Sequence, residues 1–255
     1  MKHFQVVKLN NRKQWLIILF MAFFAAFYLF AETTSSFSVF NKNETETQAL
    51  IKSGEKNSKQ IALTFNISWG QEKVYKVLDV LKKENIHATF FVSGEWAERH
   101  PEILNKIAED NHEIGMLGYR YKSYVKQDIE EVRKDLLQAK EVFRKLGYED
   151  LTLVRPPSGH FNEEVLDTVK KLGFSTIYWS INPNDWKNPG SKEIVNTVLD
   201  DASSGDIILL HASDIIKHTE TALKDIIPAI KKKKLSFVTV SELISNSSSE
   251  SKPLN

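Results

Sequence analysis

Residues 61–81 read IALTFNISWGQEKVYKVLDVL, which joins a strand pattern directly to a helix pattern. Residues 61–65 form a short and mostly apolar run, as in a buried strand. After a break at residues 66–73, apolar residues recur three or four positions apart, at Val74, Val77, Leu78 and Leu81. A strand followed by an amphipathic helix is the repeating unit of a parallel α/β sheet.

The same unit recurs along the chain. Further strand candidates are Ala88–Val92, Glu113–Leu117, Leu151–Val154, Ser175–Ser180, Ile207–His211 and Phe237–Val240. Amphipathic helix patterns lie between them, and a glycine follows three of the helices, at Gly147, Gly173 and Gly205. This alternation predicts a single-domain α/β fold: a parallel (β/α) barrel, distorted or incomplete, with seven to eight strands. An open, doubly wound sheet is the alternative.

Composition and charge exclude several classes of function. The chain has 255 residues, and its 34 Lys+Arg against 33 Asp+Glu give a formal net charge of +1, which offers no electrostatic basis for binding nucleic acid. The absence of cysteine excludes disulfides, thiolate zinc sites and cysteine nucleophiles. No glycine-rich phosphate-binding motif follows the first strand, so nothing supports nucleotide binding.

The N-terminal region has the pattern of a membrane anchor. Residues 1–14 carry four basic side chains, whereas residues 15–31 (WLIILFMAFFAAFYLFA) carry no charge. A basic flank holds its end of an apolar helix in the cytoplasm, and this segment is about 25 Å long as a helix, at the short limit for a span. We expect a cytoplasmic N-terminus at 1–14 and a transmembrane signal-anchor at 15–31, with a cleaved signal peptide as the alternative.

The rest of the chain divides into three parts. Residues 32–59 are rich in Ser, Thr, Asn, Glu and Lys and predict a flexible stalk, and residues 246–255 (NSSSESKPLN) predict a disordered tail. Residues 60–245 between them hold the strand and helix patterns and form one predicted domain. If the anchor is retained, this domain belongs to a single-pass membrane protein and lies on the extracytoplasmic side.

In a parallel barrel the functional site lies at the C-terminal ends of the strands, and the sequence is most unusual there. The five segments at these ends are residues 64–70 (TFNISWG), 112–121 (HEIGMLGYRY), 155–159 (RPPSG), 179–186 (WSINPNDW) and 209–211 (LLH). In this order they resemble the polysaccharide deacetylase family (the NodB-homology domain) over about residues 60–244. Their details are most similar to the PdaB-type sporulation branch.

The resemblance implies a hydrolase that removes N-acetyl groups from amino sugars of peptidoglycan or a related cell-wall or spore glycan. In the family, the first segment carries a base Asp and a metal-binding Asp, and the second carries two metal-binding His. Zinc then polarises the acetamide carbonyl and activates water. Arg155 and Asp185 match residues that tune the base and its neighbours, and His211 matches the general acid.

This chain departs from the family at the base and at the metal ligands. Asn66 stands at the base position, and a neutral amide does not accept a proton at neutral pH. The three metal-ligand positions are occupied by Ile67, Leu117 and Tyr121. The first two side chains are hydrocarbon and cannot bind a metal, and a neutral phenol binds zinc poorly. The sequence therefore predicts no metal and no cofactor. The remnant of the family's catalytic group is then Asn66, Arg155, Asp185 and His211.

Three hypotheses of function follow. The first is a degenerate family member, uncertain as an enzyme, that binds cell-wall or spore glycan, or a protein partner, without zinc catalysis. The alternative is an active hydrolase of amino-sugar amides, which uses zinc or a rearranged, metal-independent site. An unrelated (β/α) enzyme that matches by chance is the third.

Aromatic side chains gather near the predicted rim of the site, where they either pack or stack on sugars. We expect Arg155 and Asp185 to pair near Asn66 and His211, because all four end or follow strands whose ends share one face. The expected partners are the glycan and, through the anchor, the cytoplasmic membrane. The residues predicted to contact sugar are Trp69, Tyr119 and Trp186.

Overall fold

The computed structural model describes residues 49–50 and 59–248, which belong to one compact unit, Thr45–Asn255. The predicted cytoplasmic N-terminus and anchor, nearly all of the stalk, and residues 249–255 lie outside the described ranges. Within those ranges, no helix has both the length and the apolar character to cross a bilayer. The last helix runs to Ser248, so residues 246–248, predicted as tail, are helical.

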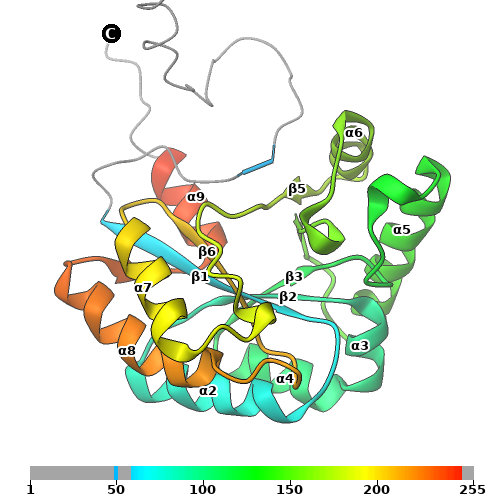
Figure 1. The fold of residues 1–255 in the computed structure, drawn as a ribbon. Coiled ribbons are helices and arrows are strands. Elements are labelled where there is room, and N and C mark those ends of the chain that lie inside the picture. The colour runs from blue at the N-terminus through cyan, green and yellow to red at the C-terminus, as the bar shows by residue number, and fades with distance from the viewer. Residues whose placement is uncertain (1–48, 51–58, 249–255) are drawn as a thin grey trace, which may run out of the picture. The chain divides into compact units, whose positions relative to one another are not determined.

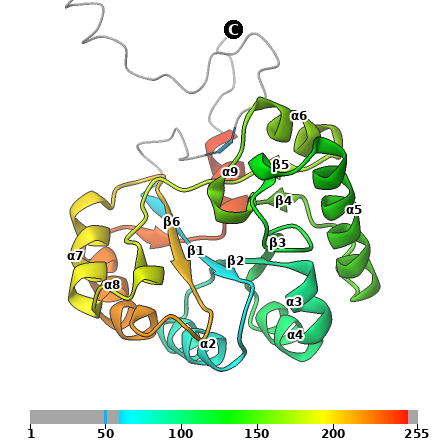
Figure 2. The ribbon, with the colours of Figure 1, turned by 45° about the vertical axis from the view of Figure 1, so that its right-hand side comes forward.

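The described strands form one parallel sheet of seven strands (Figure 1). Its order is β5-β4-β3-β2-β1-β6, and β7 pairs with the start of β1. Figure 2 shows β6 and β1 side by side, with helices around the outside of the strands. The bounds are β1 Gln60–Ile67, β2 Thr89–Val92, β3 Glu113–Met116, β4 Leu153–Val154, β5 Ser175–Thr176, β6 Ile207–His211 and β7 Ser236–Phe237.

A short seam links the two ends of the sheet. The predicted strand Ser175–Ser180 ends early, at Thr176, and the chain then crosses toward β6. There Ile181 forms a single parallel bridge with Ile208, and its carbonyl accepts a hydrogen bond from the amide of Leu209 (2.9 Å). The strands therefore close into a ring through one irregular contact, which confirms the predicted distorted parallel barrel.

Helices follow the strands, as the periodicity predicted for α2, α5, α6 and α7. Sequence reasoning missed α3 and α4, which are short and separated only by His100, and α8, whose pattern is interrupted by Pro228. It also extended the last strand to Val240, which instead begins α9. The bounds are α2 Glu72–Glu84, α3 Gly94–Arg99, α4 Pro101–Glu109, α5 Ile129–Lys145, α6 Glu163–Lys171, α7 Ser191–Asp201, α8 Thr219–Lys232 and α9 Val240–Ser248.

The core has two parts because side chains alternate along each strand. Ile61, Leu63, Phe65 and Ile67 of β1 belong to the larger cluster, which includes buried residues of the surrounding helices. Ala62 belongs to a smaller cluster with residues of the other strands and of α9. We infer that this second cluster fills the barrel interior, so that α9 covers one end and the other end is left for a site.

His112, just before β3, is a buried histidine. Its Nδ1 accepts a hydrogen bond from the amide of Ala88 (3.2 Å), whereas its Nε2 has no hydrogen-bond partner among the residues that the structure describes. Burial, assisted by the nearby His87, lowers the pKa of His112 from 6.5 to about 4. The folded domain therefore holds this ring neutral.

We expect acid to destabilise the domain through His112. The unfolded chain takes up a proton near pH 6.5, but the folded one does so only near pH 4. The stabilising effect is therefore complete above about pH 6.5 and is lost as the pH falls toward 4, by up to about 3 kcal/mol. Urea unfolding between pH 4 and 8 measures it. His112→Asn, which keeps an acceptor for Ala88, should flatten the pH dependence, whereas His87→Asn on the exposed neighbour should reduce it only in small part, because burial is the larger cause of the shift. An unchanged slope in His112→Asn would contradict the assignment.

Candidate functional site

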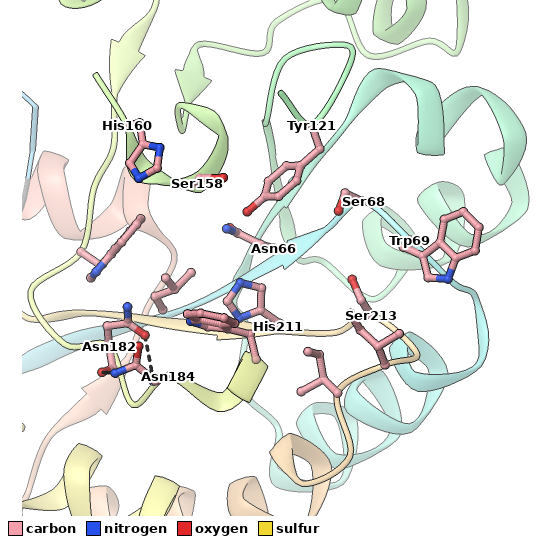
Figure 3. Close-up of a pocket in the computed structure, with 15 residues that line it drawn as sticks. Asn66, Ser68, Trp69, Tyr121, Ser158, His160, Asn182, Asn184, His211 and Ser213 are labelled. Carbon is pink, nitrogen blue, oxygen red and sulfur yellow. Dashed lines mark hydrogen bonds between the residues drawn. The ribbon is translucent and has the colours of Figure 1, made fainter. Parts of the chain in front are cut away.

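The C-terminal ends of the strands surround a cavity of about 520 Å³ (Figure 3). Asn66 at the end of β1 and His211 at the end of β6 are neighbours in the sheet, and both face the cavity. The lining includes residues of all five segments singled out in the sequence, together with the loop after β6. The lining residues are Asn66, Ser68, Trp69, Tyr121, Ser158, His160, Trp179, Asn182, Asn184, Trp186, Leu209, His211, Ser213, Ile215 and Ile216.

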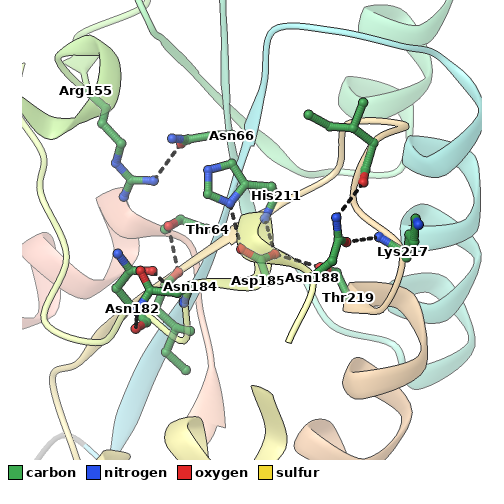
Figure 4. A network of polar contacts seen from close by, with 12 residues as sticks. Thr64, Asn66, Arg155, Asn182, Asn184, Asp185, Asn188, His211, Lys217 and Thr219 are labelled. Atoms are coloured by element: carbon green, nitrogen blue, oxygen red, sulfur yellow. Dashed lines mark hydrogen bonds and ion pairs between the residues drawn. The ribbon is translucent and has the colours of Figure 1, made fainter. Parts of the chain in front are cut away.

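Arg155 lies beside Asn66 (Figure 4) and is completely buried. Its Nη1 donates to Oδ1 of Asn66 (3.0 Å), Nη2 to the carbonyl of Tyr178 (2.9 Å) and Nε to the carbonyl of Ile177 (3.3 Å). The guanidinium also lies 4.0 Å from the ring centroid of Phe91. Burial lowers the pKa of Arg155 to about 9, so the group still carries its charge at neutral pH.

Asp185 is also completely buried and holds His211. Its Oδ1 contacts Nδ1 of His211 (2.7 Å), and its Oδ2 accepts from the backbone amide of His211 (2.8 Å) and from the hydroxyl of Thr219 (2.6 Å). A carboxylate at Nδ1 favours the tautomer with the proton on that atom. The other ring nitrogen, Nε2, is then the one available for acid–base work.

The predicted pairing of Arg155 with Asp185 is wrong, although both lie at the same end of the barrel. Arg155 satisfies its donors on Asn66 and on two carbonyls that follow β5, whereas Asp185 satisfies its oxygens on His211 and Thr219. The four remnant residues therefore form two separate pairs. Thr219 belongs to the start of α8, a helix that the sequence reasoning missed.

The loop after β3 is held by Asp135 of α5. Its carboxylate accepts from the backbone amides of Tyr119 and Arg120 (both 2.9 Å) and from the hydroxyl of Tyr124 (2.8 Å). This loop brings Tyr121 to the cavity. The hydroxyl of Tyr119 instead donates to Glu98 (3.2 Å), and Tyr119 is not among the residues that line the cavity, so a sugar contact has no support there.

Two tryptophans stand at the cavity with exposed rings. Trp69 is 63% exposed and Trp186 is 50% exposed, so neither is explained by core packing. The loop that carries Trp69 is fixed by Asp214, which accepts from the amides at the start of α2 (2.8–2.9 Å). Sequence reasoning missed Asp214, because the helix that it caps lies more than 140 residues away in the chain.

The positions at which the resemblance implies metal ligands are occupied by side chains of two kinds. Ile67 and Leu117 are fully buried, each in one of the two hydrophobic clusters, and neither lines the cavity. Tyr121 is 40% exposed and does line it. Among the residues that the structure describes, no three His, Cys, Asp or Glu side chains are grouped to hold a metal ion. The donor set present does not fit zinc.

Comparison with known proteins gives concordant results. A family model for polysaccharide deacetylase matches residues 53–177. The chain is 39% identical over 191 residues to a peptidoglycan-N-acetylglucosamine deacetylase of Bacillus cereus, covering 74% of this chain and 89% of that one. It is 31% identical over 195 residues to the peptidoglycan-N-acetylmuramic acid deacetylase PdaA of Bacillus subtilis, covering 75% and 73%.

Two similar solved structures are of a protein described as a pseudoenzyme. One is a wild-type CE4-family pseudoenzyme from Bacillus anthracis, with a TM-score of 0.73 and 27% identity, covering 78% of this chain and 69% of that one. The other is a mutant of the same protein with restored enzymatic activity, again with a TM-score of 0.73 and 27% identity, covering 78% and 72%. The matched fold, segments and relatives agree: this chain belongs to the polysaccharide deacetylase family.

Proposed function

We propose that this protein is a degenerate polysaccharide deacetylase that binds cell-wall glycan without zinc-dependent deacetylation. One observation carries the proposal: the side chains of Ile67 and Leu117 are buried hydrocarbon where the family has metal ligands. Neither offers a lone pair, and a catalytic zinc needs about three protein ligands besides its water. The wild-type B. anthracis protein of similar structure, which is described as a pseudoenzyme, is a precedent for a degenerate relative.

The cavity supports the binding half of the proposal. Its volume of about 520 Å³ is within the range of ligand pockets, and Trp69 and Trp186 present exposed rings beside it. Flat aromatic faces suit the apolar faces of sugar rings. The relatives are named for peptidoglycan, so we assign peptidoglycan or a related wall or spore glycan as the ligand.

A second candidate, a metal-independent amide hydrolase, is favoured by the contact between Asp185 and His211 (2.7 Å). Such a pair can move a proton between Nε2 of His211 and a bound substrate, and general acid–base help contributes about 10²–10⁴ in rate. Amide cleavage without a metal also needs stabilisation of the oxyanion. We rank this candidate second because it leaves the attacking water without a carboxylate base at residue 66.

The purified domain should contain no stoichiometric zinc and should release no acetate from acetylated chitin or peptidoglycan oligomers. The physical reason is the hydrocarbon at positions 67 and 117. Metal content by mass spectrometry and an acetate assay, each with and without a chelator, test this. The related B. cereus enzyme serves as the positive control. One equivalent of tightly held zinc would refute the proposal, whereas chelator-resistant acetate release would establish the second candidate.

We further propose that the domain stays attached to the outer face of the cytoplasmic membrane through residues 15–31. The support is the uncharged run behind a basic N-terminus. Protease added to intact protoplasts is expected to remove the domain, while a cytoplasmic protein is spared as the control. Full protection, or a mature chain that begins at Glu32, would contradict this topology.

A further inference from the structure

The side-chain amide of Asn66 is held in one orientation by Arg155. A guanidinium has only donors, so the atom that it meets 3.0 Å away must be Oδ1 of Asn66. The opposite atom, the Nδ2 donor, has no partner among the described residues, and Asn66 lines the cavity. At the position where the family has a carboxylate that accepts protons, this cavity therefore presents a hydrogen-bond donor.

Arg155 adds a positive charge below that donor. Its recorded hydrogen bonds all go to neutral oxygens, and it forms no ion pair with any residue that the structure describes. The carboxylate of Asp185 is already bound by His211 and Thr219. A buried charge is poorly screened, so its field reaches the cavity and favours an anion there.

Tyr121 supplies a second donor. It lines the cavity, and no hydrogen bond of its hydroxyl to a described residue is recorded. Figure 3 shows Tyr121, Asn66 and His211 around the same space. His211 donates from Nε2 only as an imidazolium, so the two neutral donors and the buried charge carry the argument. Two donors facing one space fit the two oxygens of a carboxylate.

The cavity is much larger than a carboxylate alone, and its entrance carries exposed indole rings on Trp69 and Trp186. We propose that it binds a sugar acid, with the carboxylate on Asn66 Nδ2 and the Tyr121 hydroxyl and the sugar ring against the tryptophans. This rests on the proposed function and deepens it, since it names the charged group by which a glycan unit is recognised. The replacement of the base by Asn66 then changes the ligand preference as well as removing the base.

The test uses N-acetylmuramic acid, its methyl ester and N-acetylglucosamine, titrated into the domain by calorimetry at pH 7 with and without excess chelator. The ester keeps the shape of the acid and removes its charge. We expect the acid to bind at least about tenfold more tightly than either neutral sugar, since hydrogen bonds to a charged group are the stronger kind. Sodium acetate and sodium lactate should compete, but more weakly than the sugar acid.

Matched variants assign the effect to the proposed donors. Asn66→Asp should weaken binding of the acid at least about tenfold, because it turns a donor into an acceptor and neutralises Arg155. Tyr121→Phe should weaken the acid about threefold or more and tests the proposal even if Asn66→Asp misfolds. Asn184→Asp adds the same charge to the cavity lining at a residue that does not bond to Arg155, so it should weaken binding of the acid less than Asn66→Asp does.

The outcomes separate this inference from the proposed function. Failure of the acid to bind, equal binding of the acid and its ester, or an unchanged affinity in both Asn66→Asp and Tyr121→Phe overturns the inference. Equal, chelator-resistant binding of all three sugars would overturn it while leaving the proposed function intact. Binding that the chelator abolishes would overturn both, because it would place a metal in the site.

Discussion

The fourfold variant Asn66→Asp, Ile67→Asp, Leu117→His and Tyr121→His is expected to bind one equivalent of zinc and to release acetate from acetylated glycan, whereas the natural chain is expected to release none. The three ligand changes supply the donors that zinc needs, and the change at Asn66 returns a proton acceptor beside the metal-bound water. Arg155, Asp185 and His211 serve as they stand. A mutant of the similar B. anthracis pseudoenzyme has restored enzymatic activity, which is a precedent for recovery by substitution.

Partial variants show which step each change restores. The triple ligand variant, with Asn66 unchanged, should bind zinc but turn over about 10²–10⁴ times more slowly than the fourfold one, because it lacks the base. Asn66→Asp alone should produce neither zinc binding nor acetate. Metal content and acetate release measure both. If the fourfold variant is folded and zinc-loaded but inactive, the positioning of the new histidines by their neighbours is what is missing. Acetate release by Asn66→Asp alone would contradict the assignment of Ile67 and Leu117.

The restored site is also expected to cost stability when it is empty. Ile67 and Leu117 are completely buried, so Ile67→Asp places a carboxylate in an apolar cluster. The metal-free fourfold variant should therefore unfold at a lower temperature than the natural domain, and added zinc should raise that temperature. A calorimetric scan with and without zinc provides this readout beside the activity.

Removing the buried arginine is expected to give the largest loss of stability among single changes at the site. Arg155→Met fills most of the same volume but leaves Oδ1 of Asn66 and the carbonyls of Ile177 and Tyr178 without their donor. We expect a loss of about 3 kcal/mol, less than the sum of three bonds because the cost of burying the charge disappears as well.

Two further substitutions check the cause of that loss. Arg155→Lys keeps the charge but cannot reach three acceptors, so it should lose about 2 kcal/mol. Arg144→Met, on an exposed residue that pairs with Glu141, should change stability by less than about 0.5 kcal/mol. Urea unfolding at pH 7 gives all three values. A loss in Arg155→Met no larger than that in Arg144→Met would show that the buried bonds contribute little to the folded state.

Most of the fold follows from the periodicity of the chain. Strands such as β1 and β6 are apolar runs with clear ends, and α2 and α5 repeat at helical spacing, so local sequence was sufficient. For the strand predicted at residues 175–180, the local sequence was not sufficient. Ser180 donates its amide to the carbonyl of Ile207 in β6, a partner that only the closed ring brings near. Tertiary contact, and not local propensity, determines the conformation of that segment.

The candidate site was predictable by position but not by partner. Parallel strand ends share one face, so Asn66, Arg155, Asp185 and His211 were expected together, and they are. Charge complementarity suggested that Arg155 would pair with Asp185, but it does not show which oxygens lie nearer. Carbonyl groups have no sequence signature, and two of them take the donors of Arg155. The role of Asp214 was hidden for a similar reason, since its partners are backbone amides of a distant helix.

The barrel has a strongly paired half, formed by β6, β1 and β2, and a weakly paired half, formed by β4, β5 and the seam between Ile181 and Ile208. β1 pairs with β6 over five residues and with β2 over four, whereas β4 and β5 pair over two and the seam has one bridge. Local opening begins where few backbone bonds must break together, so amide hydrogens of the seam exchange with solvent long before those of β1. Asn66 and His211 belong to the strongly paired half, and Arg155 follows a strand of the weakly paired one. A ligand that contacts both halves therefore holds the ring shut, and its binding slows the exchange of amides that it never touches.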